Sequence, residues 1–364
     1  MSFELIENDH GLVDCCASLT GQAWLAIDTE FMREKTYYPQ LCLVQIASPD
    51  HIFCIDTLSV SETGPLQALL DSRETTKVFH AARQDLEVLH FLCGMPPAPV
   101  FDTQIAAALL GFDDQLGYAA LVEAITGVVL PKTHQRTDWS KRPLPNEQLE
   151  YAADDVRYLR ELYPRLLERL EQQHRIAWAL EDNGRLTDER LYQIKPEMAF
   201  VRIKQGGALP PAQQHVLREL AAWRERLAQK RNRPRNWIAR DGLLVYLAQT
   251  QPQTTEQLEQ VRGLSDSMRK QQGDNLLAAI HAGRQQIGGP IYDRLGPLTP
   301  SETERRDRLL ARLKSRAAEL EIRPQVLGAR REVDAIVRGN NNSLLLQGWR
   351  RQVVGEELLE IDRG

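Results

Sequence analysis

The sequence predicts an α/β domain with a mixed sheet flanked by helices, followed by two all-helical domains. Three observations lead to this prediction. Three strand-like segments with short connections open the chain, helices and short strands then alternate, and every later segment has helical periodicity. We expect the α/β domain and its exit helices at residues 1–200, and the helical domains at residues 208–290 and 298–364.

Three successive strands are expected at residues 22–30, 40–48 and 51–56. Their connections are too short for crossover helices, so we expect antiparallel neighbours. The next segments are predicted as helices at 64–71, 84–93, 103–110 and 116–125, with short strands at 77–80 and 100–102. Asn146 is a good N-cap residue for a long helix that runs towards residue 170.

The chain after Pro210-Pro211 is predicted to be helical throughout. Helices are expected at 212–230, 236–249, 254–261, 265–271 and 274–285. Proline and glycine residues, such as Pro234 and Gly263, separate these segments. A Gly- and Pro-rich stretch at 288–300 then links them to a second helical set at 301–360.

The composition is that of an ordinary soluble protein. Of 364 residues, 42% are hydrophobic and 26% are charged, and no apolar run approaches membrane-spanning length. The acidic N-terminus lacks the basic-then-apolar pattern of a signal sequence. Five cysteines, an odd number that includes the neighbours Cys15 and Cys16, favour reduced thiols and a cytoplasmic location. No Cys/His spacing resembles a zinc site.

The net charge of −5 conceals two oppositely charged halves. Residues 1–200 hold 17 basic and 31 acidic residues, whereas residues 201–364 hold 28 and 19. Within residues 201–240 there are 10 basic residues and 2 acidic ones. This asymmetry favours a metal-using site coupled to a surface that binds a polyanion, although a solvated Arg-rich helix gives the same counts.

The segment Trp24-Leu25-Ala26-Ile27-Asp28-Thr29-Glu30 is an apolar strand that ends in two carboxylates. Side chains alternate along a strand, so Asp28 and Glu30 share one face while Thr29 points to the other. Two buried carboxylates repel each other, and a divalent cation between them relieves that cost. For this pair alone, a strand end that enters solvent is the alternative.

Two later positions are candidates to join this pair. Asp85 begins a helix directly after the strand at 77–80, where its side chain can reach over the sheet edge. Tyr151 and Asp155 are four residues apart on the long helix and therefore share a helical face. Taken alone, Asp85 is also explained as a first-turn acid favoured by the helix dipole, and Tyr151 as a core residue.

Three nearby polar residues have simpler explanations. We expect Asp154 to be solvated or salt-bridged on the long helix. Asp102, before Thr103 at a strand-to-helix junction, is expected to be an N-cap. His80 is expected to pack near the site rather than to act in catalysis.

Three motifs resemble the DEDD superfamily of exonucleases: Asp28-Thr29-Glu30-Phe31, His80-Ala81-Ala82-Arg83-Gln84-Asp85 and Tyr151-Ala152-Ala153-Asp154-Asp155. The Tyr-x-x-x-Asp spacing is typical of the tyrosine subclass. Tyr37-Tyr38-Pro39-Gln40-Leu41 and the segment 137–144 are similar to the ribonuclease D family, and residues 211–285 and 300–360 resemble its HRDC domains. The resemblance covers nearly the whole chain and implies a ribonuclease H-like fold for the first domain.

The resemblance implies a site for two divalent ions, Mg²⁺ or Mn²⁺, about 3.5–4 Å apart. Asp28 would bridge both ions, while Glu30 and Asp155 would help to hold the ion that carries the attacking water. Asp85 would hold the second ion through bound water. Tyr151 would orient the attacking water as a protonated phenol, and Glu30 is also placed to bind the terminal 3′-hydroxyl.

Nucleic-acid contacts are expected from aromatic and basic side chains near the motifs and on the helix at 218–235. Aromatic residues offer stacking faces to a splayed 3′ end, although core packing explains Tyr38 and Trp139 equally well. Basic residues offer phosphate contacts of low sequence specificity. The residues expected to contact RNA are Tyr38, Lys132, Arg136, Arg142, Arg226 and Arg233.

The resemblance implies a 3′–5′ exoribonuclease that releases nucleoside 5′-monophosphates from structured RNAs such as tRNA precursors. We expect a cytoplasmic monomer that makes no membrane contact. Two alternatives remain open. The first is a DNA 3′–5′ exonuclease, because the acidic residues do not read the sugar. The second is a non-catalytic RNA-binding adaptor, against which the presence of all four acids and Tyr151 argues.

Overall fold

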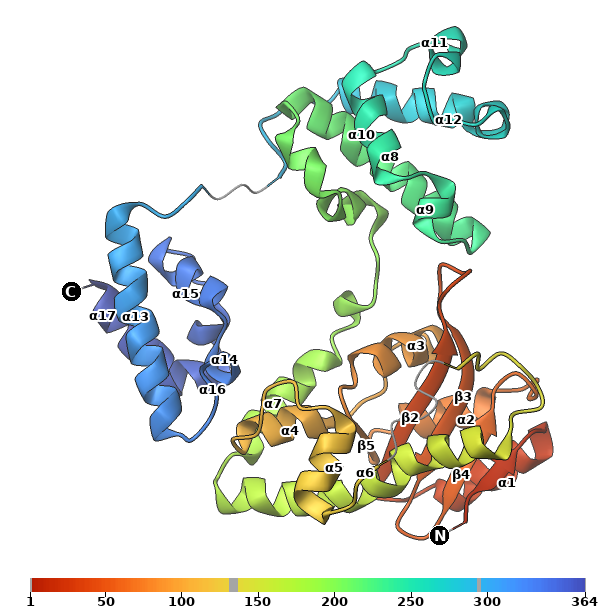
Figure 1. The fold of residues 1–364 in the computed structure, drawn as a ribbon, viewed down its shortest axis with the longest axis vertical. Helices are drawn as coiled ribbons and strands as arrows, with labels where there is room; N and C mark the ends of the chain where they lie inside the picture. The colour runs from red at the N-terminus through yellow and green to blue at the C-terminus, as the bar shows by residue number, and fades with distance from the viewer. Residues whose placement is uncertain (1, 131–136, 293–295, 364) are drawn as a thin grey trace. The chain divides into compact units, whose positions relative to one another are not determined.

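The computed structural model describes residues 2–130, 137–292 and 296–363, which form two compact units (Figure 1). The first unit contains the residues up to Met32, Leu41–Leu191 and the residues from Pro297 on. The second contains Arg33–Gln40 and Tyr192–Gly296. These two units are defined by contacts between segments and do not correspond to the three domains expected from the sequence, so the predicted domain boundaries stay predictions.

A six-stranded mixed sheet, counted over the described residues, forms the centre of the first unit, with strand order β1-β4-β3-β2-β5-β6. The strands are β1 (Glu4–Ile6), β2 (Trp24–Met32), β3 (Gln40–Ala47), β4 (Ile52–Asp56), β5 (Thr76–Phe79) and β6 (Val100–Asp102). β3 and β4 pair antiparallel, as predicted, whereas β1 pairs with β4, and β5 with both β2 and β6, in parallel. The predicted mixed sheet is confirmed, and β2 lies inside it between β3 and β5.

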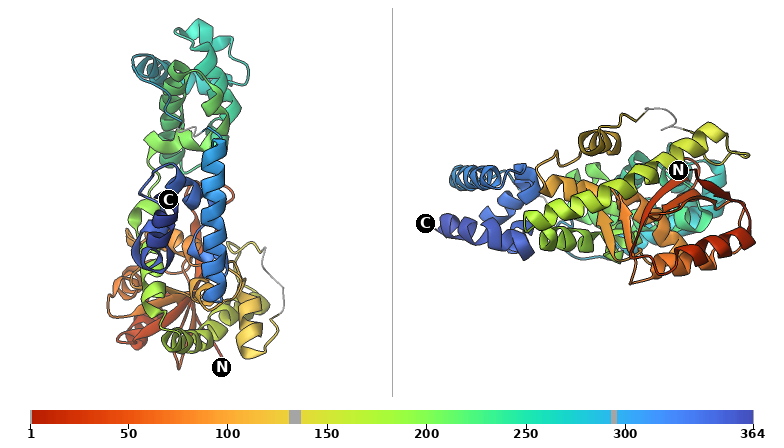
Figure 2. Two further views of the ribbon diagram at one scale, coloured as in Figure 1. Left: turned by 90° about the vertical axis from the view of Figure 1, so that its left-hand side faces the viewer. Right: turned by 90° about the horizontal axis from the view of Figure 1, so that it is seen from below.

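Helix α6 (Asn146–Gln172) packs against β2, β4 and β5 (Figures 1 and 2). Its buried residues recur every three or four positions and include Leu149, Ala153 and Val156. The other helices of this part of the chain are α1 (Asp9–Leu19), α2 (Gly64–Asp71), α3 (Arg83–Cys93), α4 (Thr103–Leu109), α5 (Tyr118–Thr126) and α7 (Ile176–Leu186). The apolar face of α6 therefore fixes this helix over the central strands of the sheet.

The start of the chain and the start of α6 differ from the predictions. Strand β1 and helix α1 were not predicted; Asn8 caps α1 by accepting a hydrogen bond from the Gly11 N–H at 2.9 Å. Asn146 is not the N-cap of α6 but its first residue. Pro145 takes the cap position in an extended conformation and makes no side-chain cap bond, so the helix begins without a capping side chain.

The second unit is helical. After 3₁₀ turns at Pro196–Arg202 and Lys204–Ala208 come α8 (Pro211–Arg231), α9 (Arg235–Ile238), α10 (Asp241–Thr250), α11 (Thr255–Glu259) and α12 (Asp266–Arg284). The prediction of one continuous helix at 236–249 is wrong, because the chain turns between α9 and α10. At this turn the buried Arg224 side chain donates to the Ala239 carbonyl at 2.9 Å and to the Asp241 carboxylate at 2.6 Å. The break predicted after residue 271 is also wrong. Gly273 lies inside α12, where a glycine costs about 1 kcal/mol but does not end a helix.

The segment Arg33–Gln40 joins β2 to β3 yet belongs to the second unit. Asn232 ends α8 in a left-handed conformation, and its side-chain oxygen accepts the backbone N–H groups of Tyr37 and Tyr38 at 3.0 Å each. The Tyr37 hydroxyl donates to the buried Glu225 carboxylate at 2.5 Å. These bonds tie both tyrosines to the end of α8.

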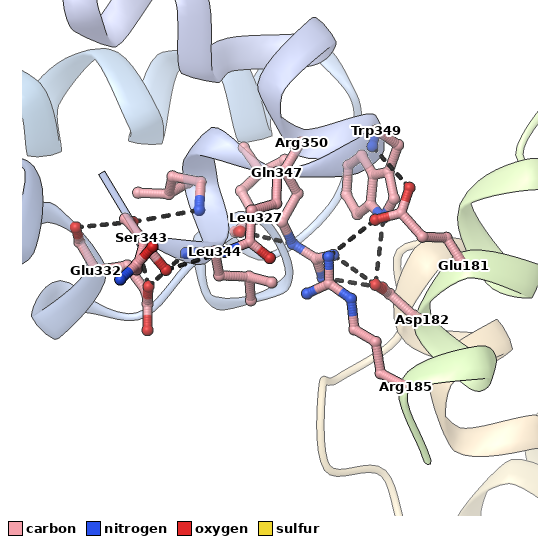
Figure 3. Close-up of polar contacts among 12 residues, drawn as sticks. Glu181, Asp182, Arg185, Leu327, Glu332, Ser343, Leu344, Gln347, Trp349 and Arg350 are labelled. Carbon is pink, nitrogen blue, oxygen red and sulfur yellow. Dashed lines mark hydrogen bonds and ion pairs between the residues drawn. The ribbon is translucent and has the colours of Figure 1, made fainter. Parts of the chain in front are cut away.

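The C-terminal helices pack on α7 within the first unit (Figure 3). They are α13 (Pro300–Glu319), α14 (Pro324–Leu327), α15 (Arg330–Val337), α16 (Gly348–Arg350) and α17 (Glu356–Arg363). The rings of Trp178 and Trp349 stack at 4.4 Å with an interplanar angle of 8°. Arg350, which is buried, donates two hydrogen bonds to Asp182 at 2.5 and 2.9 Å. A Cβ at Gly348 would lie 1.8 Å from a Glu181 carboxylate oxygen, and the backbone there has φ 48°, a left-handed conformation that favours glycine.

No helix in the described ranges combines the length and apolar character needed to cross a bilayer. All five cysteines carry free thiols, in line with the odd count. The fold therefore rests on apolar packing and polar contacts without covalent cross-links.

We predict that Asp182→Ala lowers the free energy of unfolding by about 3–5 kcal/mol, because it leaves the buried Arg350 guanidinium without its carboxylate. Urea denaturation of the full chain measures this. The double variant Asp182→Ala, Arg350→Met should recover a large part of the loss, since it removes the unpaired charge as well. Asp188→Ala, which breaks the exposed pair with Arg190, is the control and should change little. Equal losses in both single aspartate variants would contradict the assignment.

Candidate active site

Asp28 and Glu30 on β2 face a cleft of about 230 Å³. The preceding residues of the strand, Leu25 to Ile27, are almost fully buried, so the strand carries its carboxylates to the end of the apolar core. The cleft is lined by Asp28, Thr29, Glu30, His80, Tyr118, Tyr151, Asp155 and Leu159. The predicted shared face of Asp28 and Glu30 is therefore present.

Asp155 of α6 completes a cluster of three carboxylates. Because α6 packs against β2, the Asp155 side chain lies close to those of Asp28 and Glu30. One carboxylate oxygen of each residue lies within 4.8 Å of the others, a separation that one cation can span. Hard oxygen donors in this arrangement suit Mg²⁺ or Mn²⁺, so these side chains fit a divalent ion.

Asp85 approaches the cluster from the first turn of α3 and is 8% exposed. The Thr29 hydroxyl donates a hydrogen bond to its carboxylate at 2.6 Å. Sequence reasoning assigned Thr29 no role, yet Thr29 lines the cleft and its hydroxyl binds the Asp85 carboxylate. Asp85 lies outside the group of three that could share one ion, but its charge acts on Asp28 and Asp155.

Burial raises the pKa of each acid, and repulsion by other carboxylates adds to it; for Asp85 that other carboxylate is Asp102. The pKa of Glu30 rises to about 9, first through burial and then through the charges of Asp155 and Asp85. Burial raises the pKa of Asp155 to about 7, with Asp85 adding to it, and raises that of Asp85 to about 7 against the opposing Thr29 hydrogen bond. The pKa of Asp28 is raised well above its usual range by burial and by its three acidic neighbours. Such a cluster favours either bound protons or a cation.

Tyr151 lines the same cleft, one helical turn before Asp155. Burial and then the charges of Asp155 and Glu30 raise the pKa of the phenol above its usual value of 10. The phenol therefore stays protonated at neutral pH and is a hydrogen-bond donor within the cleft. The Trp139 ring lies 6.4 Å from the Tyr151 ring, with an interplanar angle of 31°.

Tyr118, which sequence reasoning did not single out, supports α6 from within the cleft. Its hydroxyl donates to the backbone carbonyl of Asp154 at 2.9 Å and also to that of Asp155. His80 lies beside it, with ring centroids 5.6 Å apart, and both of its nitrogens are hydrogen-bonded, to the Thr103 hydroxyl and the Leu116 carbonyl. Burial lowers the pKa of His80, which agrees with a packed, neutral imidazole.

The two carboxylates set aside in the sequence have the predicted structural partners. Asp154 forms an ion pair with Arg157 on the same helix. Asp102 caps α4 by accepting the Gln104 N–H at 2.8 Å. Neither belongs to the group that could share a metal ion.

The Arg142 guanidinium forms hydrogen bonds within the protein. Its guanidinium donates to Asp56 at 2.5 and 2.6 Å, and to the carbonyls of Cys42, Trp139 and Lys141 at 2.9, 2.7 and 2.7 Å. These bonds use all five N–H groups of an arginine, so none remains for a phosphate. Arg142 instead stabilises the loop that contains the buried Trp139, whose carbonyl accepts one of these bonds.

The other residues expected to contact RNA are only partly placed. Lys132 and Arg136 lie outside the described residues. Tyr38 packs edge-on against Tyr37 at 4.9 Å. Arg226 is exposed and lies 3.5 Å from Glu197, and the Arg233 guanidinium lies 5.9 Å from the Trp237 ring. Their contacts with RNA remain predictions.

Comparison with known proteins agrees with this geometry. A family model described as a 3′–5′ exonuclease matches residues 3–171, and an HRDC domain model matches residues 213–280. Ribonuclease D of Gluconacetobacter diazotrophicus is 39% identical over 375 residues, covering 99% of this chain and 93% of its own length. Ribonuclease D of Pseudomonas paraeruginosa is 37% identical over 361 residues, covering 97% and 96%.

A solved structure is similar over the same extent. The crystal structure of Escherichia coli RNase D, described as an exoribonuclease involved in structured RNA processing, has a TM-score of 0.89 and 31% sequence identity. The match covers 100% of this chain and 99% of that one. The similarity thus includes the C-terminal helices as well as the sheet.

We predict that the metal-free protein becomes less stable as the pH rises from about 4.5 to about 9. Glu30 releases its proton near its ordinary pKa of 4.5 when unfolded, but only near 9 when folded. Its contribution to stability is therefore present at low pH and is lost as the pH rises through this window. Thermal unfolding with chelator measures the decline, and saturating Mg²⁺ should flatten it, because the ion replaces the bound proton.

Two variants make this prediction specific. Glu30→Gln should reduce the pH dependence seen with chelator and also the stabilisation by Mg²⁺. Asp154→Asn, which alters the ion-paired neighbour of Asp155, should leave the Mg²⁺ response unchanged. A decline that is the same in wild type and Glu30→Gln would contradict the electrostatic assignment.

Proposed function

The chain belongs to the ribonuclease D family of 3′–5′ exoribonucleases, and we propose that it trims the single-stranded 3′ ends of structured RNAs, tRNA precursors foremost, releasing nucleoside 5′-monophosphates. The observation that supports this most is the convergence of Asp28, Glu30 and Asp155 on one cleft beside Tyr151. Family membership favours RNA over DNA and argues against an adaptor without activity.

Four carboxylates would hold two divalent ions, Mg²⁺ or Mn²⁺. When bound, such ions activate water and stabilise the charge that develops on the scissile phosphate and the leaving 3′-oxygen. Asp28, Glu30 and Asp155 offer oxygens to a shared position, and Asp85 approaches from α3. Thr29 fixes the Asp85 carboxylate through its hydroxyl.

Tyr151 would orient the attacking water. Its phenol is protonated at neutral pH, so it donates a hydrogen bond and does not act as a base. The proton lost by the attacking water would pass to a carboxylate of the cleft or to solvent. Glu30 is placed to accept a hydrogen bond from the terminal 3′-hydroxyl, which would make the cleft a reader of chain ends.

The RNA body would dock on the second unit, at a hollow of about 610 Å³ between α9, α10 and the loop before α12. Trp237 and Tyr246 line this hollow and are 59% and 41% exposed, which is unusual for rings this large. Arg240 and Arg262 line it too, are exposed, and have no acidic residue among their lining neighbours. Exposed rings beside exposed cations suit stacked bases and their phosphates.

This hollow is a better candidate for docking than the face of α8 chosen from the sequence. Arg224 is fully buried against Asp241, and Arg218 pairs with Glu219, so these cations of α8 are engaged within the chain. Arg233, which lies over the Trp237 ring, is the predicted contact residue that adjoins the hollow. Arg233, Arg240 and Arg262 thus lie beside exposed aromatic rings.

We also expect a cytoplasmic monomer. The free thiols of all five cysteines agree with a reducing compartment. Sedimentation of the purified chain tests the oligomeric state, and a dimer at micromolar concentration would overturn that part of the proposal.

We predict that Asp28→Asn and Asp155→Asn abolish shortening of a 3′-tailed RNA hairpin, because each removes an oxygen donor from the cluster. The assay follows 5′-labelled RNA with Mg²⁺, Mn²⁺ or chelator. Wild type and Asp154→Asn should give a metal-dependent ladder that shortens from the 3′ end. Shortening that persists in chelator, or in both cluster variants, would refute the proposed site.

We predict that the double variant Trp237→Ala, Tyr246→Ala weakens binding of the tailed hairpin at least tenfold, since base stacking contributes about 1–3 kcal/mol per base. Binding is measured by fluorescence anisotropy with chelator, to prevent cleavage. Hydrolysis of a short oligonucleotide should be unchanged. Met198→Ala, at another exposed apolar side chain of the same unit, is the control. Unchanged binding of the hairpin would remove the hollow from the account.

A further inference from the structure

The turn before α3 is held in an unfavourable backbone conformation. Ala81 has φ 57°, in the left-handed region that residues with a Cβ seldom adopt. Ala82 follows as the N-cap of α3 and provides no side-chain cap. Asp85 lies in the first turn of that helix, so the conformation of this turn sets the position of its carboxylate. A strained turn persists only where its surroundings fix it.

The Asp102 carboxylate supplies that constraint. One of its oxygens accepts the Ala81 N–H and the other accepts the Ala82 N–H, both at 2.9 Å. Asp102 is 3% exposed, so water does not compete for these bonds. Because the two amides belong to the turn itself, the carboxylate binds this conformation and not an extended one.

Asn183 fixes Asp102 in turn. Its side-chain oxygen accepts the Asp102 backbone N–H at 2.8 Å, and its amide nitrogen donates to the Ala179 carbonyl, also at 2.8 Å. Asn183 is 1% exposed and lies on α7. The next residues towards the N-terminus, Asp182 and Glu181, are those that bind Arg350 and Trp349 of the C-terminal helices (Figure 3).

We propose that Asp102 and Asn183 are positioning residues for catalysis, which hold Asp85 in place through the Ala81-Ala82 turn. The proposal rests on the proposed function, because it takes Asp85 to be a metal-binding acid. The connection runs from α7, which the C-terminal helices contact, through β6 to the first turn of α3. Neither Asp102 nor Asn183 lines the cleft. The charge of Asp102 also raises the pKa of Asp85, but Asn183 carries no charge, so its effect on Asp85 comes from position alone.

A merely structural role for Asp102 makes a different prediction. Asp102 also caps α4 through the Gln104 N–H at 2.8 Å, and loss of this cap would destabilise the fold without moving Asp85. The two roles separate at Ala81. Glycine adopts positive φ without the cost that alanine bears, so Ala81→Gly relieves the turn but does not act on the α4 cap.

The test measures metal binding and turnover in the full chain. Asp102→Asn should weaken Mn²⁺ binding, followed by calorimetry without RNA, and lower kcat, each by about 10- to 100-fold, as is typical when a partner of a metal ligand is lost. KM for the tailed hairpin should stay within about twofold. Adding Ala81→Gly to Asp102→Asn should restore a large part of both losses, whereas Tm need not recover. Asn183→Ala should shift Mn²⁺ binding in the same direction.

Three results would overturn the proposal. They are Mn²⁺ affinity and kcat at wild-type values in folded Asp102→Asn, losses that Ala81→Gly leaves unchanged, and wild-type Mn²⁺ binding in Asn183→Ala. If Asp102→Asn does not fold, Asn183→Ala decides the question alone. Asn8→Ala, which removes the cap of α1, is the control and should lower Tm without altering Mn²⁺ binding. Failure of the wild-type protein to shorten the tailed hairpin with Mg²⁺ or Mn²⁺ would instead refute the proposed function, so the two failures are distinguishable.

Discussion

Mutual repulsion among buried carboxylates is the constraint on which the rest of the site depends. Asp28, Glu30, Asp85 and Asp155 come from a strand and two helices, and burial raises the pKa of every one of them. Without a cation such a cluster binds protons or weakens the fold. The fold therefore holds together four carboxylates that repel one another. A divalent ion that binds among them relieves this repulsion, and this favours binding of the ion.

Separate contacts hold the strand and the two helices that carry the four carboxylates. β2 lies inside the sheet and fixes Asp28 and Glu30 through its buried residues. Tyr118 donates to backbone carbonyls of α6 at the level of Asp155, and Thr29 holds Asp85. The C-terminal helices contact α7, which reaches the turn of α3 through Asn183 and Asp102. The second unit, by contrast, carries the exposed rings and cations that suit an RNA surface.

The sequence was informative where a local pattern determines the outcome. Alternation along β2 and the four-residue spacing of Tyr151 and Asp155 placed these side chains on the correct faces. It failed where partners are distant in the chain. Arg142 is a residue type that commonly binds phosphate, yet its guanidinium binds the carboxylate of Asp56, 86 residues away in the chain. Tyr118 had no signal, because its partners are backbone carbonyls on another helix. The docking of α16 on α7 likewise depends on long-range contacts that no spacing reveals.

The most direct test of the account is the fate of the oxygen that cleaves the RNA. Digestion of a tailed RNA in water labelled with heavy oxygen, followed by mass spectrometry of the mononucleotides, identifies both product and nucleophile. The account predicts nucleoside 5′-monophosphates with one heavy oxygen on the phosphate, formed only with a divalent ion and only when the acidic cluster is intact. Products with a cyclic phosphate would show that the RNA itself supplies the nucleophile. Such products, products with a 3′-phosphate, or release in chelator would contradict the proposed mechanism.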